Sequence, residues 1–379
     1  MLSDWRSWLS LTKRRLRGRN AQPHIVQPEG TLELGSASCT FIVVCGPNFD
    51  QTVPNAGTTA RMGWCHGFEQ VGIPYVLVSV FELAQRLPEL PGPLCWISGT
   101  DYLYLDHANL AALKKCRHIV WVDPWFHGEA DFYRRHDFPY TTMPENINRK
   151  ILLSEPELVF AISPESSFEY FSLWVEHGAH LVSLPLACDS LLYRSDAPFC
   201  PEFADVEMAF VGGYWAYKAR QFDIYLKPYA DRLKVFGYSP WPYAGYGGLL
   251  PDSKEPSLYR QARLSPTINE PHVEVMGVSL NERVFKVLGS GGMTVTDVTP
   301  AYCEWFGQDE LLVPGSIEEY HAMVRQALTD SDINRRYREK GYQAILARHT
   351  YAHRAQQVLS LLGFAADIKP VRERYVPTN

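Results

Sequence analysis

Polar and charged residues that suit a phosphate group open the segment 281–297. Asn281, Glu282 and Arg283 stand before apolar residues that recur at three- and four-residue spacing, as on one face of a helix. The first turn of a helix offers free N–H groups and a partial positive charge, which favour a phosphate or a sugar hydroxyl. The segment is therefore predicted to form the floor of a nucleotide site.

A pair of glycines followed by basic residues predicts a second phosphate contact. Gly212 and Gly213 directly follow an apolar run, where a backbone without side chains lets a phosphate approach closely. Lys218 and Arg220 come next and supply positive charge. Group transfer from a diphosphate needs such charge, because the leaving phosphate takes the bonding electrons. A simple tight turn and surface residues at a helix start are the alternatives.

A cluster of polar residues ends another predicted strand. Asn269, Glu270 and His272 stand in the sequence INEPH, where Pro271 is expected to block a helix and leave the polar groups in a loop. We expect these side chains to contact phosphate or sugar, with capping and loop hydrogen bonds as the alternative. Asp297 ends the next strand and either contacts a sugar or caps the following segment.

Acidic residues at the ends of two predicted strands in the N-terminal half suit proton transfer. Asp101 and Asp123 both follow apolar runs, and His127 and Glu129 follow in DPWFHGE. A carboxylate or imidazole there can remove a proton from an attacking hydroxyl, although Asp also caps helices and turns. His127, Glu129 and His136 do not match a zinc-ligand spacing, and we expect neither a metal nor another cofactor.

Alternating strands and helices must position these groups. Residues 39–45 form a nearly continuous apolar run, as in a parallel strand buried on both faces. Helices are predicted over 59–71 and 108–116, and strands over 75–80, 94–98, 118–122, 157–162 and 180–184. The pattern then restarts with strand 207–211, helix 219–230, strand 232–236, helix 257–262 and strand 264–268. Two such α/β units predict two Rossmann-like domains that face each other across a cleft.

The segment 281–297 fits the second unit as a helix, a turn and a strand. Gly291 and Gly292 are predicted to end the helix, because glycine takes positive φ without steric cost. Residues 293–296 are then a short β-prone run. The expected organisation is a basic segment and linker over 1–35, domains over 36–195 and 196–350, and a C-terminal helix and tail over 351–379 that packs back over the interface.

Charge and composition narrow the partners. The 379-residue chain has a net charge of −6, which argues against broad binding to nucleic acid. The first twenty residues nevertheless hold six basic residues and one acidic residue. Together with Trp5, Trp8, Leu9 and Leu16 they suit a short helix on an anionic membrane surface. A disordered tail, or a tail packed on its own domain, is the alternative.

The cysteines and the hydropathy pattern predict a cytoplasmic protein, peripheral to a membrane at most. The eight cysteines form no CxxC pair and several stand in apolar runs, as expected of buried reduced thiols. No apolar run approaches the roughly 20 residues that span a bilayer. No signal peptide is evident, because the basic cluster follows the Trp/Leu segment.

Several segments, in order, carry a family resemblance: 207–213 (EMAFVGG), 233–237 (LKVFG, ending at Gly237), 257–269, 281–297 and 348–354 (RHTYAHR). Residues 207–213 are similar to the first strand and phosphate loop of a donor-binding domain, and 233–237 to its second strand. Residues 257–269 and 281–297 are similar to the elements around the donor site, and 348–354 to a closing HTYxHR motif. The C-terminal half thus resembles glycosyltransferases of the GT-B fold, in particular the CgeB-like group named for a spore-maturation protein. The motifs are fairly specific over 205–360, whereas 36–190 match by strand order only.

The resemblance implies a nucleotide sugar in the C-terminal domain and a glycan, lipid-linked or other acceptor in the N-terminal domain. Asn48, Arg61 and Trp125 are then expected on the acceptor side. Arg61 follows a glycine-containing loop and would bind an anionic acceptor. Trp125 and Phe126 would form a stacking platform for a sugar, with burial in the core as the alternative.

One residue departs from the family pattern. Related GT-B enzymes place a glutamate five residues before the turn glycine, where it holds the donor ribose, and Lys286 stands there in this chain. Glu282, one helical turn earlier, is expected to supply the carboxylate, and Lys286 to neutralise a diphosphate. The departure leaves open a GT-B protein that binds a nucleotide or glycan without catalysis. The resemblance leans towards retention of the anomeric configuration.

Overall fold

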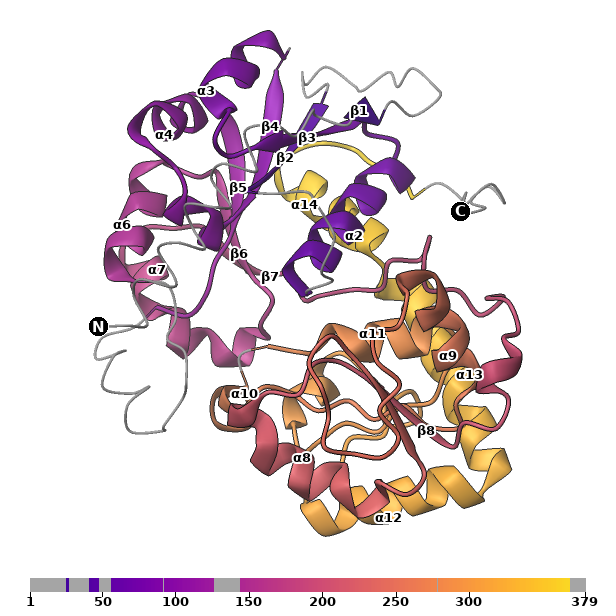
Figure 1. The fold of residues 1–379 in the computed structure, drawn as a ribbon. Helices are drawn as coiled ribbons and strands as arrows, with labels where there is room; N and C mark the ends of the chain where they lie inside the picture. Colours follow the sequence, from indigo (N-terminus) through magenta and orange to yellow (C-terminus); the bar gives the residue numbers. More distant parts are fainter. Residues whose placement is uncertain are drawn as a thin grey trace.

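The computed structural model describes residues 25–26, 41–47, 56–90, 92–125, 144–277 and 279–368. They form two α/β domains (Figure 1), so the predicted fold class is confirmed. Several sites predicted from the sequence lie outside the described residues: Asn48, Phe126, His127, Glu129, His136 and the basic segment 1–20.

The N-terminal domain is built on one largely parallel sheet. Its strands are β1 (Ile25–Val26), β2 (Phe41–Gly46), β3 (Tyr75–Ser79), β4 (Pro93–Ser98), β5 (Arg117–Trp121), β6 (Leu158–Ala161) and β7 (Leu181–Ser183). They lie in the order β1-β3-β2-β4-β5-β6-β7, and β1 alone pairs antiparallel among these strands. Val43 of the central strand β2 lies opposite Val76 on one side and Cys95 on the other. The apolar run of β2 is explained by this position, because both of its faces are covered.

Helices cover both faces of this sheet. On one face lie α2 (Ala56–Gln70) and α14 (Tyr351–Leu361), where Trp64 packs against Trp96, Phe160 and Tyr351. The other face carries α3 (Leu83–Arg86), α4 (His107–Lys114), α6 (Glu145–Leu153) and α7 (Ser172–Glu176). Successive strand residues point to opposite faces, so each of the strands β2 to β7 contributes to both apolar clusters.

The C-terminal domain repeats this plan with a smaller sheet. β8 (Met208–Val211) and β9 (Leu233–Phe236) pair parallel, and parallel bridges Met208–Leu264, Thr267–Thr296 and Val295–Leu312 extend the sheet. Its helices are α8 (Ala219–Tyr225), α9 (Glu255–Gln261), α10 (Pro271–Met276), α11 (Glu282–Gly289), α12 (Ile317–Thr329) and α13 (Ser331–Arg348). Short 3-10 turns connect several elements, among them Gly99–Leu103 after β4 and Ala216–Lys218 before α8.

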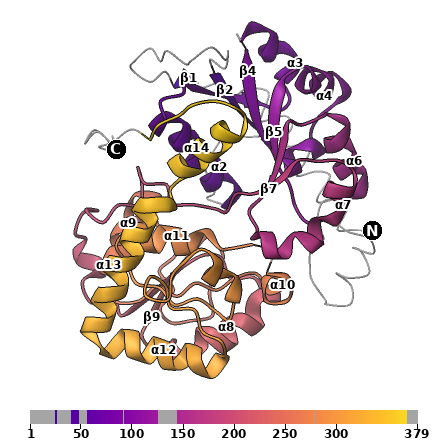
Figure 2. The ribbon, with the colours of Figure 1, turned by 180° about the vertical axis from the view of Figure 1, so that it is seen from behind.

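The chain crosses between the domains twice. It leaves the N-terminal domain after β7 and returns at the end of α13, so that α14 lies beside α2 (Figures 1 and 2). A Cβ atom on Gly67 of α2 would stand 2.4 Å from the carbonyl oxygen of Tyr351, so glycine allows this close approach. One apolar cluster joins residues of α2 and α14 to residues of α11 and α13.

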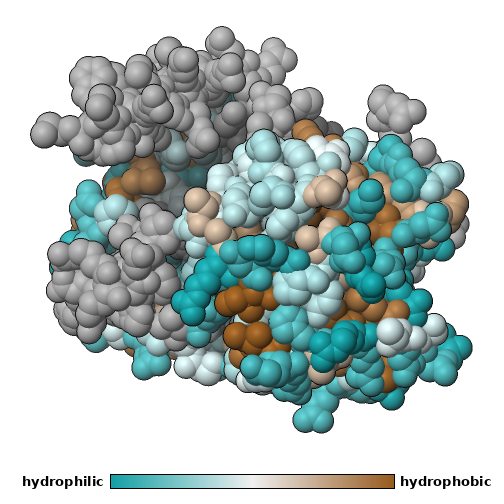
Figure 3. All heavy atoms as spheres, turned by 60° about the horizontal axis from the view of Figure 1, so that its bottom comes forward, coloured by the Kyte–Doolittle hydropathy of each residue, from teal (hydrophilic) through white to brown (hydrophobic). Residues whose placement is uncertain are grey.

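On the outer face of the C-terminal domain, hydrophilic residues are mixed with small patches of apolar residues (Figure 3).

One local prediction is wrong. Pro271 does not hold the INEPH sequence in a loop; it starts α10, with Glu270 as the residue before the helix. The first turn of a helix tolerates proline, because an N–H there has no acceptor within the helix in any case. The glycine turn is as predicted: α11 ends at Gly289, and Gly291 adopts a φ of 70°.

Candidate functional site

The strand order places the candidate site at the carboxyl end of β8. With β8 as strand 1 and β9 as strand 2, the parallel pairs give the order 2-1-3-4-5, in which the third strand runs through Leu264; a further parallel bridge, Val235–Tyr246, lies at the β9 edge. The connections therefore leave β8 and the third strand towards opposite sides. Ligands of doubly wound sheets bind at such a switch point. Here Gly212 and Gly213 follow β8, and Asn269 and Glu270 follow the third strand.

A cleft of about 410 Å³ opens at this point. Most of the predicted donor-binding residues line it: Gly212, Gly213, Lys218, Gly237, Asn269, Glu270, Asn281, Glu282, Arg283 and Lys286. Thr59, Ile162 and Leu186, which lie outside the C-terminal sheet domain, complete the wall. The cleft thus receives side chains from both halves of the molecule, as a reaction between two bound substrates requires.

Arg283 provides the least neutralised positive charge in the cleft. Its Nη2 and Nε donate to the carbonyl oxygen of Val211 at 2.7 Å and 3.2 Å, and its guanidinium lies 4.0 Å from the centre of the Phe210 ring. In the described part of the chain, its buried Nη1 finds no hydrogen-bond acceptor. Leaving such a group unsatisfied is costly, so the guanidinium is suited to an anionic ligand.

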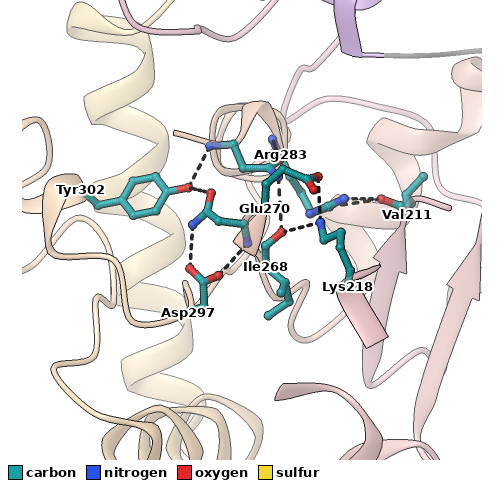
Figure 4. A network of polar contacts seen from close by, with 9 residues as sticks. Val211, Lys218, Ile268, Glu270, Arg283, Asp297 and Tyr302 are labelled. Carbon is teal, nitrogen blue, oxygen red and sulfur yellow. Dashed lines mark hydrogen bonds and ion pairs between the residues drawn. The ribbon is translucent and has the colours of Figure 1, made fainter. Parts of the chain in front are cut away.

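Lys218 brings a second cation to the same wall (Figure 4). Its Nζ lies 3.0 Å from Oε1 of Glu270 and 3.4 Å from the carbonyl oxygen of Ile268. Burial lowers the pKa of Lys218, while the Glu270 carboxylate opposes that effect. Lys218 thus contacts Glu270 after the third strand, and Arg283 contacts the Val211 carbonyl at the end of β8 (Figure 4).

Asp297 holds this wall in place instead of facing a ligand. The carboxylate is fully buried and accepts the backbone N–H and the side-chain amide of Asn269, both at 2.6 Å. Tyr302 donates to Oδ1 of Asn269 at 3.1 Å and accepts from the backbone N–H of Asn281 at 3.0 Å (Figure 4). This chain of hydrogen bonds ties the start of α11 to the Glu270 loop. Asn269 and Asp297 are thus positioning residues by geometry.

Glu282 is held by three partners from three helices. It accepts from Thr59 of α2 at 2.7 Å and from Tyr351 of α14 at 3.1 Å, and Lys286 Nζ lies 3.0 Å away. Arg283, considered above for its charge, is not the partner of this carboxylate. Burial lowers the pKa of Lys286, but Glu282 and then Glu255 outweigh burial, so the pKa is raised and the ammonium stays charged. The carboxylate expected to hold a ribose is instead bound within the protein.

The structure adds residues that sequence reasoning missed. Trp215, Tyr238, Asp252 and Glu255 all line the cleft. Glu255 accepts hydrogen bonds from the hydroxyls of Tyr193 and Tyr259, both at 2.7 Å. These residues stand in loops or at helix starts without a repeating spacing, so no periodic signal could mark them.

Four predicted donor-binding residues lie outside the cleft. Arg220 is exposed on α8, and His272 lies within α10, where burial lowers its pKa to about 4. Gly291 and Gly292 lie beyond the far end of α11 from the cleft and shape the turn there. Gly237 does line the cleft, and a Cβ atom there would stand 2.2 Å from the carbonyl oxygen of Gly212.

In the N-terminal domain, Asp101, predicted to take a proton, pairs with Arg61, predicted to bind an anionic acceptor. Asp101 follows β4 and lies 3.1 Å from Nη2 of Arg61, with both side chains buried. Burial raises the pKa of Asp101, and Arg61 opposes that rise. Asp123 follows β5, and burial raises its pKa to about 6. Neither carboxylate is among the residues that line the cleft.

The assignment of Trp125 to a sugar platform is wrong. Its side chain is 2 % exposed and packs edge-to-face on Trp174, with ring centres 5.0 Å apart. An aromatic residue after a strand fills a core as readily as it lines a site, and here it has no free face for a sugar.

Neither a metal-binding cluster nor a membrane-spanning helix is present in the described ranges. No three His, Cys, Asp or Glu side chains there are grouped to hold a metal ion. Within the same ranges, no helix has the length and apolar character needed to cross a bilayer.

Comparisons with known proteins agree with this geometry. Residues 218–360 match a family model described as glycosyl transferase-like. Anabaena HepE, solved in complex with UDP and glucose, superposes with a TM-score of 0.58 at 12% identity, over 86% of this chain and 99% of that chain. A comparison with curated proteins by sequence gives no match.

Two synthases share the same fold. Sucrose-phosphate synthase from Thermosynechococcus elongatus gives a TM-score of 0.57 at 11% identity, over 86% of this chain and 98% of that chain. The UDP-forming α,α-trehalose-phosphate synthase from Burkholderia xenovorans, in complex with glucose-6-phosphate, gives 0.57 at 9% identity, over 85% and 99%. The chain thus has the two-domain GT-B architecture, and its C-terminal domain carries the glycosyl transferase-like match.

Proposed function

We propose that the protein is a glycosyltransferase that moves a sugar from a nucleotide-sugar donor to an acceptor bound between the two domains. The observation that carries this proposal is the cationic floor of the cleft, where buried Arg283 Nη1 has no acceptor among the described residues. A diphosphate supplies the oxygens that such a guanidinium lacks. Structures of the same fold that bind UDP and UDP-glucose support this choice of ligand.

In the proposed reaction, an acceptor hydroxyl oxygen forms a bond to the anomeric carbon of the donor sugar. The bond from that carbon to the diphosphate oxygen breaks, and its electron pair leaves with the nucleoside diphosphate. Lys218 and Arg283 stabilise the charge that develops on this leaving group, so we propose that no metal ion is needed. The acceptor proton passes to a base in the N-terminal domain or to the leaving phosphate. Closure of the domains excludes water and limits hydrolysis of the donor.

Asp123 is the base that we propose for an inverting reaction. It stands at the carboxyl edge of the N-terminal sheet, and its raised pKa of about 6 matches the transfer of a proton near neutral pH. Asp101 is less suited, because the Arg61 guanidinium holds its carboxylate. A retaining reaction would instead send the proton towards the phosphate.

We also propose that the protein belongs to the CgeB-like group and that its acceptor is a glycan or a lipid-linked molecule. We further propose that it is a cytoplasmic enzyme that contacts anionic membranes through residues 1–20.

The test is donor binding and turnover by the full chain with UDP-, GDP-, CMP- and dTDP-sugars. Calorimetry measures affinity, and release of the nucleoside diphosphate measures transfer or hydrolysis. Arg283→Met should weaken binding of the active donor roughly 10- to 150-fold, equal to about 1.5–3 kcal/mol for hydrogen bonds with a charged partner. Arg220→Met is the matched control, because Arg220 is exposed outside the cleft. Absence of binding across the panel would refute the proposal.

A second candidate is a GT-B protein that binds a nucleotide sugar without catalysis. The observation in its favour is Glu282, whose carboxylate is engaged by Thr59, Tyr351 and Lys286. Tight donor binding without release of sugar or nucleotide, with every acceptor class tested, would select this candidate.

A further inference from the structure

Two aromatic side chains stand at the mouth of the cleft with much of their surface open. Trp215 follows the Gly212–Gly213 loop and is 37 % exposed, and Tyr238 follows β9 and is 48 % exposed. Large aromatic side chains are usually better covered, so two of them together at a cleft mouth suggest a ligand that covers them.

The two rings hold each other in a fixed arrangement. Trp215 and Tyr238 meet edge-to-face, with ring centres 5.5 Å apart and planes at 67°. A Cβ atom on Gly213 would stand 3.2 Å from the indole of Trp215, so this ring lies directly on the glycine loop. Tyr217 lies beside the indole with nearly parallel planes, at a ring-centre distance of 6.4 Å. The indole is therefore oriented in advance, immediately next to the loop that we assign to the phosphates.

The shape of the cleft decides which part of a donor reaches these rings. Besides Arg283 and Lys218, the lining includes Gly237, Tyr238 and Leu249, which follow β9 in the chain; Asp252 and Glu255 also line the cleft, within electrostatic reach of Lys286. On the opposite side, the wall is completed by Thr59 and Ile162, which belong to the N-terminal domain. The sugar must face the N-terminal domain, where an acceptor can reach it. The nucleoside must then extend towards β9.

The polarity along the β9 side fits a nucleoside as well. Asp252 is a hydrogen-bond acceptor in this lining, whereas Glu255 already accepts from the hydroxyls of Tyr193 and Tyr259; Leu249 adds apolar surface. Carboxylates repel a diphosphate but accept hydrogen bonds from ribose hydroxyls. A flat base has a π-face that stacks on Trp or Tyr whatever its identity.

We propose that Trp215 and Tyr238 form the platform on which the nucleobase of the donor stacks, with the ribose towards Asp252. This inference rests on the proposed function and adds the orientation of the donor and the residues that hold its base. It assigns the base to side chains that follow β8 and β9 instead of to α11. In this orientation, the sugar of the donor lies between α10, the start of α11 and the N-terminal domain.

The experiment compares a nucleotide with a ligand that lacks the base. UDP, GDP, CDP and dTDP are titrated into the wild-type chain by calorimetry, and the tightest of them is taken forward beside inorganic pyrophosphate. Trp215→Ala should weaken nucleotide binding about tenfold or more, equal to about 1.4 kcal/mol per tenfold, and leave pyrophosphate binding within about twofold. Trp215→Phe keeps a stacking ring and should recover most of the affinity.

Two controls separate stacking from a general effect. Tyr238→Phe should bind like the wild type, because the ring and not the hydroxyl forms the platform. Phe199→Ala removes an aromatic residue that is 65 % exposed outside the cleft, and should change neither affinity. Equal melting temperatures show that each variant is folded.

The remaining outcomes identify which idea is at fault. If the wild type binds neither the nucleotides nor pyrophosphate, the proposed function fails and this inference with it. If the wild type binds a nucleotide and Trp215→Ala binds it equally well, the platform assignment alone is overturned. Unchanged nucleotide affinity together with a raised acceptor KM would assign the rings to the acceptor and equally overturn it.

Discussion

Glu282 and Lys286 are expected to be strongly coupled: removing one partner should destabilise the fold, and removing both should restore part of the loss. Both side chains are nearly buried, at 7% and 12% exposure, and their charged atoms lie 3.0 Å apart on successive turns of α11. Glu282→Gln leaves the hydroxyls of Thr59 and Tyr351 able to reorient, but it leaves the Lys286 ammonium without its nearest carboxylate.

The magnitude follows from the surroundings of Lys286. Removing one partner of a buried ion pair costs about 3–5 kcal/mol. Two features reduce the cost here: Glu255 also favours the charged ammonium, and the ammonium lies 5.2 Å from the centre of the Tyr193 ring. We therefore expect Glu282→Gln to lower the free energy of unfolding by about 2–4 kcal/mol. Adding Lys286→Met should recover about 2 kcal/mol, within the coupling range of contacting residues.

The assay is a double-mutant cycle from urea unfolding, followed by circular dichroism and by tryptophan fluorescence so that coincident transitions can be checked. Glu145 and Arg149 on α6 provide the matched control, because they have the same i,i+4 spacing but are 63% and 56% exposed. Their coupling should be about 0.3–0.5 kcal/mol. Additivity of Glu282→Gln and Lys286→Met to within about 0.5 kcal/mol would refute the reasoning.

Two pH-dependent predictions follow from buried groups. If Asp123 is the base, the transfer rate should rise with pH through about 6, where this carboxyl loses its proton, and Asp123→Asn should lower the rate about 10²- to 10⁴-fold with that rise removed. A pH–rate profile without a transition near 6 would exclude this role. Burial lowers the pKa of His66, but Asp189 at 2.6 Å outweighs burial, so the pKa is raised above 6.5. The charged pair therefore stabilises the fold below about pH 6.5 and is lost as pH rises through the raised pKa. His66→Gln should cost about 1–3 kcal/mol at pH 5.5 and clearly less at pH 9 in urea unfolding, and an equal cost at both would contradict this.

Much of the architecture could be predicted because it depends on local patterns. The apolar run of β2, the three- and four-residue spacing in α11 and the glycine turn after it are all short-range signals, and the structure reproduces them. The residues predicted to contact phosphate could also be identified from the sequence, because parallel strands bring Gly212 and Asn269 to the same edge of the sheet.

What could not be predicted depends on contacts between distant residues. Thr59 and Glu282 are 223 residues apart, and no spacing links them. Their contact nevertheless decides that the carboxylate is engaged within the protein. Trp125 and Trp215 show the complementary difficulty, because both follow strands, yet one is buried in the core and the other stands at the cleft mouth. Only the packing of the helices around each residue separates the two cases.

The return of α14 to the N-terminal domain has a consequence for how the chain is made. Trp64 of α2 needs Tyr351 of α14 as a packing partner, and the two belong to one apolar cluster. Translation at about 5–20 residues per second places roughly 15–60 s between the synthesis of these two helices. During that interval the first domain to emerge has an uncovered apolar face. Its completion therefore waits for the last helix, and the ribosome-bound intermediate is where we expect chaperones to be needed.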